Sequence, residues 1–186
     1  MNIILKEINR LLSKKGRIIV AIEGGSATGK STLADALARE YDANVFHMDD
    51  FFLQPHQRTK ERFQTPGGNV DWERFLEEVL IPASQGRDVT FRPFDCSTMS
   101  LGEAVTVSAK PVTIVEGVYS MHPALEKYMH FSLFLYADEE VRHARILRRN
   151  GERMLRRFVE EWIPMEDFYF EETLADERCT LRYKGD

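Results

Sequence analysis

The chain has 186 residues, and its content of 43% hydrophobic and 30% charged residues is typical of one globular domain with a full core. The formal net charge of -5 argues against a nucleic-acid-binding surface, and the longest uncharged apolar run is too short to cross a membrane. The two cysteines, Cys96 and Cys179, are far apart and lack metal-binding spacing, which favours a reduced, cytoplasmic protein.

The first predicted elements are a helix, a buried strand and a second helix. Apolar residues recur at helical spacing over residues 2–14, which predicts an amphipathic helix that ends near Gly16. The apolar, β-branched run over residues 17–23 predicts a buried strand. Strong helix formers with leucines four residues apart follow from residue 33, and we expect this helix to end at Tyr41.

The most specific motif of the chain lies between this strand and the second helix. Residues 24–32 read Gly-Gly-Ser-Ala-Thr-Gly-Lys-Ser-Thr and fit the phosphate-loop pattern G-x-x-x-x-G-K-[ST]. Glycines let successive backbone N–H groups turn toward a phosphate, and the helix N-terminus adds partial positive charge. Lys30 is expected to reach the β- and γ-phosphates of a nucleoside triphosphate, and the Ser31 hydroxyl to bind Mg²⁺. The predicted nucleotide-binding residues are Gly24, Gly25, Ser26, Ala27, Thr28, Gly29, Lys30, Ser31 and Thr32.

The remainder of the chain alternates strands and helices. Residues 53–70 contain prolines, glycines and several charges, so we expect a long functional or mobile loop there. Asp71 is expected to begin a helix that runs to Leu80. The alternation predicts an α/β fold with a mostly parallel sheet covered by helices on both faces. Further strands are predicted over residues 44–48, 89–94, 105–108, 111–116 and 131–136, and further helices over 122–129, 138–149 and from 163 onward.

Two carboxylates stand at the ends of predicted strands. Asp49 follows the strand over 44–48, and Glu116 closes the strand over 111–116. Ligands bind beyond the carboxyl ends of parallel strands, so both side chains should lie near the phosphate loop. We expect Asp49 to accept a proton from a substrate hydroxyl and Glu116 to serve Mg²⁺, although the roles could be exchanged and Asp49 could also bind the metal. The competing interpretation is that both are ordinary turn or cap residues.

Arginines crowd the segment that follows the last predicted strand. Their density predicts a lid over about residues 145–160, whose guanidinium groups stabilise a transferring phosphoryl group and exclude water. Arg149 and Arg153 are the leading catalytic candidates. A solvated helix face with acidic neighbours is the simpler alternative, and a DNA-binding face conflicts with the negative net charge. The arginines are Arg142, Arg145, Arg148, Arg149, Arg153, Arg156 and Arg157.

In order and spacing, these segments resemble the group of P-loop kinases that contains the uridine, nicotinamide riboside and pantothenate kinases. The resemblance extends from about residue 17 to about residue 170. It implies one P-loop kinase domain over residues 1–186, a three-layer sandwich with an arginine-rich lid, and ATP and Mg²⁺ as cofactors. The segments that carry it are the phosphate loop, His47-Met-Asp-Asp-Phe-Phe52, Asn69-Val-Asp-Trp72, Val115-Glu-Gly117 and the arginine-rich helix.

The resemblance also implies roles for single residues and a class of substrate. Asp49 matches the catalytic aspartate, Glu116 matches the carboxylate near magnesium, and Asp71 matches an aspartate that holds ribose hydroxyls. A helix N-cap is the alternative for Asp71. The implied acceptor is a small molecule, most often the 5′-hydroxyl of a ribonucleoside, with no nucleic-acid or membrane partner. The oligomeric state is left open, with a homo-oligomer as one option.

The chain departs from the better-known uridine kinases in one segment. Those enzymes carry a Tyr-Asp segment and, a few residues on, a histidine for the pyrimidine, whereas Met99 stands at that position here. A thioether cannot donate a hydrogen bond, so nicotinamide riboside or another non-pyrimidine acceptor is an alternative. Phe94 could stack on a flat base, and Arg92, with Arg58 and Arg62, could bind an anionic substrate. A nucleotide-binding regulatory protein without turnover is a further alternative.

Overall fold

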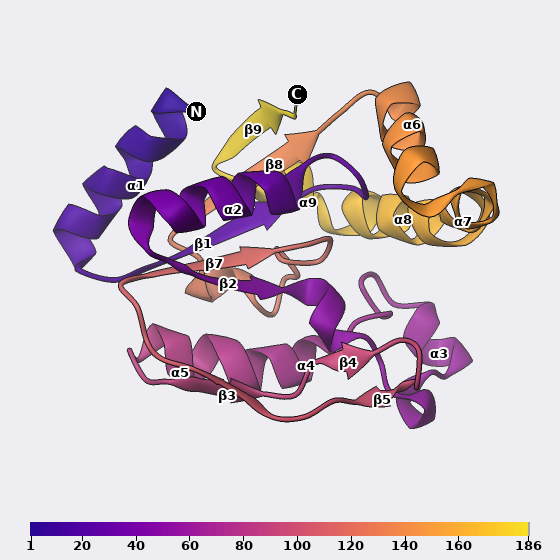
Figure 1. The fold of residues 1–186 in the computed structure, drawn as a ribbon, viewed down its shortest axis with the longest axis horizontal. Helices are drawn as coiled ribbons and strands as arrows, with labels where there is room; N and C mark the ends of the chain where they lie inside the picture. The colour runs from indigo at the N-terminus through magenta and orange to yellow at the C-terminus, as the bar shows by residue number, and fades with distance from the viewer. Residues whose placement is uncertain (186) are drawn as a thin grey trace.

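The computed structural model describes residues 1–185 and is built around a five-stranded sheet. Its strands lie in the order β2 (Asn44–His47), β7 (Val112–Glu116), β1 (Ile18–Glu23), β8 (Phe131–Tyr136) and β9 (Leu181–Lys184) (Figure 1). Every neighbouring pair in this sheet is parallel. β1 and β7 are buried along their whole length, as a parallel sheet covered on both faces requires. The predicted α/β fold with a mostly parallel sheet is confirmed.

Helices cover both faces of this sheet (Figure 1). α1 (Asn2–Lys15) and α2 (Lys30–Tyr41) pack on one face, and a helical segment over residues 72–84 and α8 (Ile163–Thr173) pack on the other. The predicted α1 ends one residue early, and α2 ends at Tyr41 as predicted but begins at Lys30, before its predicted start at residue 33. Gly16 ends α1 in the left-handed conformation, with φ at 71°, which a glycine adopts without a steric penalty.

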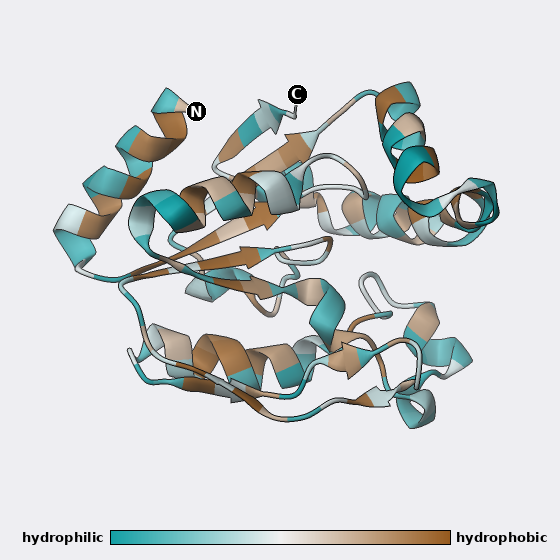
Figure 2. Cartoon of the chain, in the orientation of Figure 1, coloured by the Kyte–Doolittle hydropathy of each residue, from teal (hydrophilic) through white to brown (hydrophobic). Residues whose placement is uncertain are grey.

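The strand β1 shows how the sheet divides the core. Ile18, Val20 and Ile22 pack in one hydrophobic cluster with α1 and α2, while Ile19 and Ala21 pack in the cluster on the opposite face. Figure 2 shows the hydrophobic strands between helices whose inward faces are hydrophobic. Successive side chains of a strand point to opposite faces, so an uninterrupted apolar run serves both clusters.

Two continuous helices contain a π-helical turn, and each turn directly precedes an Ile-Pro pair. Proline lacks an N–H group and its ring clashes with the carbonyl four residues earlier, so a wider turn lets the helix pass Pro82 and Pro164. The first helix therefore extends beyond its predicted end. It consists of α4 (Trp72–Phe75), η3 (Leu76–Leu80) and α5 (Ile81–Ser84). The second consists of α7 (Glu152–Arg157), η5 (Phe158–Trp162) and α8.

Two segments differ from their predictions. Residues 53–70 are not a plain loop, because they contain the short helices η2 (Pro55–Gln57) and α3 (Lys60–Phe63). The predicted helix over 122–129 is wrong except for the single 3₁₀ turn η4 (Glu126–Tyr128). A proline follows residue 122 and disfavours helical geometry in the residue before it.

Four short strands lie outside the central sheet. The strands predicted over 89–94 and 105–108 contribute β3 and β6, which form an antiparallel pair, and a second antiparallel pair, β4 and β5, lies between them in the chain. Phe94 belongs to the second pair, where its side chain is buried. The strands are β3 (Val89–Phe91), β4 (Phe94–Asp95), β5 (Ser100–Leu101) and β6 (Val105–Val107).

The arginine-rich segment is helical on both sides of Gly151. α6 (Glu139–Asn150) and the helix that begins with α7 meet at Gly151, and they project beside the edge of the sheet (Figure 1). The short α9 (Ala175–Arg178) leads back to β9. No helix among residues 1–185 is long and apolar enough to span a membrane.

Candidate active site

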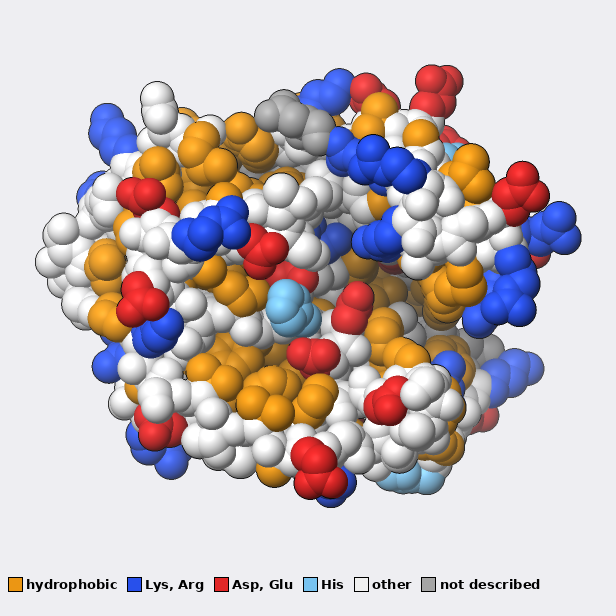
Figure 3. Space-filling view, in the orientation of Figure 1, with side chains coloured by type: hydrophobic (Ala, Val, Ile, Leu, Met, Phe, Trp, Pro, Cys, Tyr) orange, Lys and Arg blue, Asp and Glu red, His pale blue; other side chains and the backbone are white. Residues whose placement is uncertain are grey.

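The carboxyl ends of β1, β2 and β7 meet at one edge of the sheet, where a cavity of about 800 Å³ opens. Ligands of open parallel sheets bind at this edge. Figure 3 shows acidic side chains and a histidine gathered at the centre of this face, with Lys and Arg side chains above and beside them. Lys30, Ser31, Asp49 and Glu116 all line the cavity. The structure therefore brings the phosphate loop and both strand-end carboxylates together.

The phosphate loop links the end of β1 directly to the start of α2. Gly24 has a φ of 140°, and a Cβ atom there would lie 2.1 Å from the carbonyl oxygen of Leu135, so only glycine fits. Lys30 is buried, and its Nζ donates to the carbonyl oxygen of Gly25 at 2.9 Å. The ammonium group is thus held inside the loop at the cavity wall.

Two buried carboxylates contact the first half of the phosphate loop. Glu23 accepts a hydrogen bond from the N–H of Gly24 at 2.8 Å. Glu166 of α8 accepts from the N–H of Ser26 at 2.9 Å and also from its hydroxyl. The binding of the nucleotide by the residues from Gly24 to Thr32 stays a prediction. Residues from 26 to 32 line the cavity, whereas Gly24 and Gly25 do not.

Ser31 and Glu116 form a polar pair at the cavity. The Ser31 hydroxyl donates to Glu116 Oε1 at 3.1 Å, and His47 Nδ1 lies 2.6 Å from the same oxygen. Burial raises the pKa of Glu116, but the His47 contact and the charge of Lys30 outweigh it and leave that pKa below its usual value. The contact with Glu116 raises the pKa of His47.

A hydroxyl and an ionised carboxylate at this spacing fit a hard divalent cation such as Mg²⁺, which takes few protein oxygens beside water and phosphate ligands. Among residues 1–185, no cluster of three or more His, Cys, Asp or Glu side chains suits a metal ion.

Asp49 occupies a different position from Glu116. It is open to the cavity, yet enclosure by the cavity walls raises its pKa, against the charge of Lys30. The neighbouring carboxylates of Glu116 and Asp50 raise it further. A carboxylate with a raised pKa that faces a cavity is a candidate proton acceptor.

Helix α6 supplies arginines to the phosphate loop. Arg142 Nε donates to the carbonyl oxygen of Ser26 at 2.8 Å, and its Nη2 lies 3.2 Å from Glu166 Oε2. Arg145 Nη1 donates to the carbonyl oxygen of Ala27 at 3.1 Å. The guanidinium of Arg142 lies so close to Gly25 that a Cβ atom there would be 2.7 Å from it. A side chain at Gly25 would therefore require this guanidinium to shift.

The two leading lid candidates are placed differently. Arg149 lines the cavity together with Arg145 and Arg148, and its Nε donates to the side chain of Asn150. Arg153 is exposed and does not line the cavity, and its contact with a phosphoryl group stays a prediction. Arg142, which was not a leading candidate, holds the loop itself.

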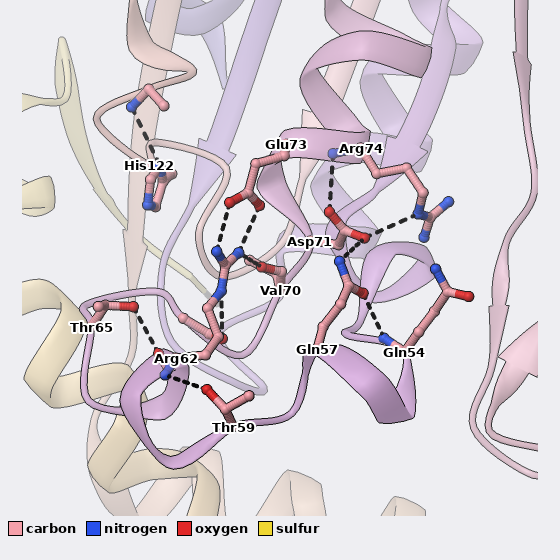
Figure 4. Close-up of polar contacts among 12 residues, drawn as sticks. Gln54, Gln57, Thr59, Arg62, Thr65, Val70, Asp71, Glu73, Arg74 and His122 are labelled. Carbon is pink, nitrogen blue, oxygen red and sulfur yellow. Dashed lines mark hydrogen bonds and ion pairs between the residues drawn. The ribbon is translucent and has the colours of Figure 1, made fainter.

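The predicted substrate residue Asp71 caps the helix that begins at Trp72 (Figure 4). Its Oδ1 accepts from the N–H of Arg74 at 3.1 Å, and its Oδ2 accepts from Gln57 Nε2 at 2.8 Å. The side chain is buried. The N-cap interpretation is confirmed, and both carboxylate oxygens already have donors.

Two of the arginines expected to bind an anion are engaged elsewhere (Figure 4 shows the first). Arg62 bonds both carboxylate oxygens of Glu73, at 2.6 and 2.7 Å, and two backbone carbonyls of its own loop. Arg92 Nε donates to the carbonyl oxygen of Gly102 at 2.7 Å and its Nη2 to that of Leu101 at 3.2 Å. Both guanidinium groups hold local structure.

Comparison with known proteins decides the family. No family model matches the chain. A uridine kinase of Chloroflexus aggregans is 31% identical over 144 residues, which cover 72% of this chain and 68% of that relative. The chain belongs to the uridine kinase family. A uridine kinase of Anoxybacillus flavithermus is 24% identical over 178 residues, which cover 86% of this chain and 83% of that relative.

The solved structures agree on the fold of this uridine kinase family member. A possible uridine kinase from Bacillus stearothermophilus superposes with a TM-score of 0.71 and 21% sequence identity, covering 97% of this chain and 98% of that one. Membership of the family makes the chain a phosphotransferase with an alcohol acceptor, and it implies a nucleotide and a divalent metal as cofactors.

Sequence reasoning missed three functional-site residues of this kinase: Glu23, His47 and Glu166. A carboxylate at the end of an otherwise apolar strand was a visible signal for Glu23. His47 carried a weaker signal, because it stands two residues before Asp49. Nothing in the local pattern marks Glu166, whose partner Ser26 is 140 positions away in the chain.

Proposed function

We propose that this chain is an ATP-dependent kinase that uses Mg²⁺ to transfer the γ-phosphoryl group to the 5′-hydroxyl of a ribonucleoside. The observation that carries the proposal is the single cavity that holds the phosphate loop, the Ser31–Glu116 pair and Asp49. These groups meet the needs of phosphoryl transfer, which are positioning, charge stabilisation and a proton acceptor.

The geometry supports separate roles for the two strand-end carboxylates. Glu116 already contacts Ser31 and His47, so with Ser31 it would hold Mg²⁺, which supplies charge neutralisation at the phosphates when bound. Asp49 faces the cavity and would orient and deprotonate the acceptor hydroxyl. Lys30 would bind the terminal phosphates, with Arg145, Arg148 and Arg149 at the cavity to stabilise charge.

The charges on the acceptor side favour an acceptor without a phosphate group. Arg62 and Arg92 are bonded to their own loops, whereas Asp49 places a carboxylate at the cavity, near the reacting position. Like charges repel, so a phosphorylated acceptor would bind poorly. Met99 stands where the better-known uridine kinases have a histidine for the pyrimidine, and its thioether cannot donate a hydrogen bond. Nicotinamide riboside, a cation without a pyrimidine, is therefore the second candidate acceptor.

ADP release from Mg-ATP should be stimulated at least about tenfold by a ribonucleoside over the rate without acceptor. The coupled assay would test uridine, cytidine, purine ribonucleosides, nicotinamide riboside and pantothenate, with uridine 5′-phosphate as the blocked control. No stimulation by any acceptor, with ATP binding verified by calorimetry, would instead support a nucleotide-binding protein without turnover.

Replacing Glu116 with glutamine should raise the Mg²⁺ concentration for half-maximal rate by about 10- to 100-fold, because a neutral amide is a poorer ligand for a hard cation. The measurement is the rate against Mg²⁺ concentration at fixed ATP. Glu103→Gln, at an exposed site, is the matched control and should behave as wild type. An unchanged Mg²⁺ dependence would remove Glu116 from the metal site.

A cytoplasmic location, a homo-oligomeric state and a single domain over residues 1–186 remain predictions from the sequence. So does a role for Asp71 at ribose hydroxyls, which would require it to give up the donor from Gln57. Binding of Phe94 to a base would require its buried ring to become exposed.

A further inference from the structure

Glu23 ends a central strand with a carboxylate that is completely buried. Its Oε1 accepts from the backbone N–H groups of Gly24 at 2.8 Å and Tyr119 at 3.2 Å. Its Oε2 accepts from the N–H of Met121 at 2.9 Å and from the hydroxyl of Tyr169 at 3.0 Å. Burying a carboxylate is costly unless its oxygens are satisfied, and here four donors satisfy them.

These donors come from three segments that border the active site. Gly24 opens the phosphate loop, Tyr119 and Met121 belong to the turn that follows Glu116, and Tyr169 belongs to α8. One side chain thus bonds all three segments. Hydrogen bonds to a buried charged group are strong, so its position fixes theirs relative to one another.

The turn after Glu116 needs such a restraint. Tyr119 has a φ of 78°, a left-handed conformation that is rarely adopted by a non-glycine residue and persists only where the surroundings impose it. Gly117 has a φ of 136°, and a Cβ atom there would lie 2.7 Å from the Cβ of Met48. Met48 directly precedes Asp49, so the turn packs against the segment that carries the predicted proton acceptor.

We propose that Glu23 is a positioning residue for phosphoryl transfer. Its carboxylate holds the turn over residues 117–121 against the phosphate loop, and thereby sets the positions of Glu116 and Asp49 relative to the bound nucleotide. The inference rests on the proposed kinase activity. Loss of the Glu23 carboxylate should lower turnover but not nucleotide affinity, because Lys30 and the cavity-lining part of the phosphate loop are not bonded to Glu23.

The pH dependence of turnover gives this role a distinct signature. The groups that face Glu23 are Lys30 of α2, Tyr119 of the turn, Tyr169 of α8 and Cys179 beside α9. Burial raises the pKa of Glu23 to about 7, against two backbone N–H bonds and the charge of Lys30. Burial also raises the pKa of both tyrosines and brings that of Cys179 to about 12, so none of these three neighbours titrates near neutral pH as Glu23 does.

The test replaces Glu23 with glutamine, which keeps the size but turns an NH₂ group toward one pair of donors. We expect kcat to fall about 10- to 100-fold while the Kd for Mg-ADP changes by less than about threefold. The part of the fall in wild-type kcat that lies near pH 7 should disappear from the profile of the variant, while the fall set by protonation of Asp49 remains. Circular dichroism verifies the fold, and Glu103→Gln is the control at an exposed glutamate.

Tyr169→Phe is the second variant and removes one donor while keeping the ring, whose centroid lies 4.8 Å from that of Tyr119. Losing this bond raises the pKa of Glu23 further, so the acid limb of kcat should move to higher pH. Tyr128→Phe, which does not contact Glu23, should leave the limb in place. If Glu23→Gln fails to fold, an unmoved limb in Tyr169→Phe overturns the proposal.

Other outcomes separate this inference from the kinase proposal. A folded Glu23→Gln with wild-type kcat and the same acid limb overturns the positioning role, as does a Kd for Mg-ADP that rises as much as kcat falls. If the wild-type protein phosphorylates no acceptor, the kinase proposal fails. Amide NMR signals of Tyr119 and Met121 then test whether the Glu23 carboxylate holds the turn. The positioning role is supported if these signals titrate near pH 7 in wild type but not in Glu23→Gln, and it is overturned if they do not respond to pH in wild type.

Discussion

Replacing Asp49 with asparagine is expected to lower kcat by about 10²- to 10⁴-fold, which is the range that a positioned proton acceptor contributes. The amide can still accept a hydrogen bond from the acceptor hydroxyl, but it cannot take its proton at neutral pH. Affinity for Mg-ATP should stay within about threefold, because Lys30, Ser31 and the backbone of the phosphate loop are unchanged.

The measurement is kcat and KM for both substrates, with Asp50→Asn as the matched control. Asp50 is the adjacent aspartate but does not line the cavity, so its replacement should change kcat by less than about fivefold. Burial raises the pKa of Asp49, and only the ionised form accepts a proton. The wild-type rate should therefore fall as pH drops through that pKa. Full turnover by a folded Asp49→Asn protein would show that Asp49 is not the proton acceptor, and Glu116 would then be the first alternative.

The central part of the fold could be predicted because its strands are buried on both faces. β1 and β7 are uninterrupted apolar runs, and the phosphate loop fixes the helix that follows β1. β9 was missed for the opposite reason. It is an edge strand whose residues alternate between half-buried and exposed, so its sequence lacks such a run. The π turns were also missed, although each Ile-Pro pair offered a local signal.

The candidate site was predictable where one short segment carries the chemistry. Lys30 and Ser31 follow from the motif, and Asp49 and Glu116 follow from their places at strand ends. Partnerships across the chain were not predictable, because nothing local marks them. For example, Arg62 was expected to bind an anionic substrate, but its guanidinium forms an ion pair with Glu73.

The charge of Lys30 acts on four buried or enclosed carboxylates at or beside the site. Its ammonium group lowers the pKa of Glu23, Asp49, Glu116 and Glu166, in each case against the effect of burial. The same charge is expected to face the terminal phosphates of ATP. Lys30 therefore has two functions in this arrangement, and one substitution tests both.

Replacing Lys30 with methionine, which keeps an unbranched apolar stem, should lower kcat by about 10²- to 10³-fold, the usual cost of losing one preorganised charge-stabilising donor. The remaining activity should have its acid limb at higher pH than wild type, because the ionised forms of Asp49 and Glu23 lose a favourable charge.

Unfolding followed at several pH values provides an independent readout. A carboxyl whose pKa is higher folded than unfolded takes up a proton on folding, so unfolding free energy falls as pH rises between those two pKa values. With Lys30 removed, this fall should be steeper than in wild type and extend to higher pH. A variant that loses activity without either shift would show that Lys30 acts on the phosphates alone.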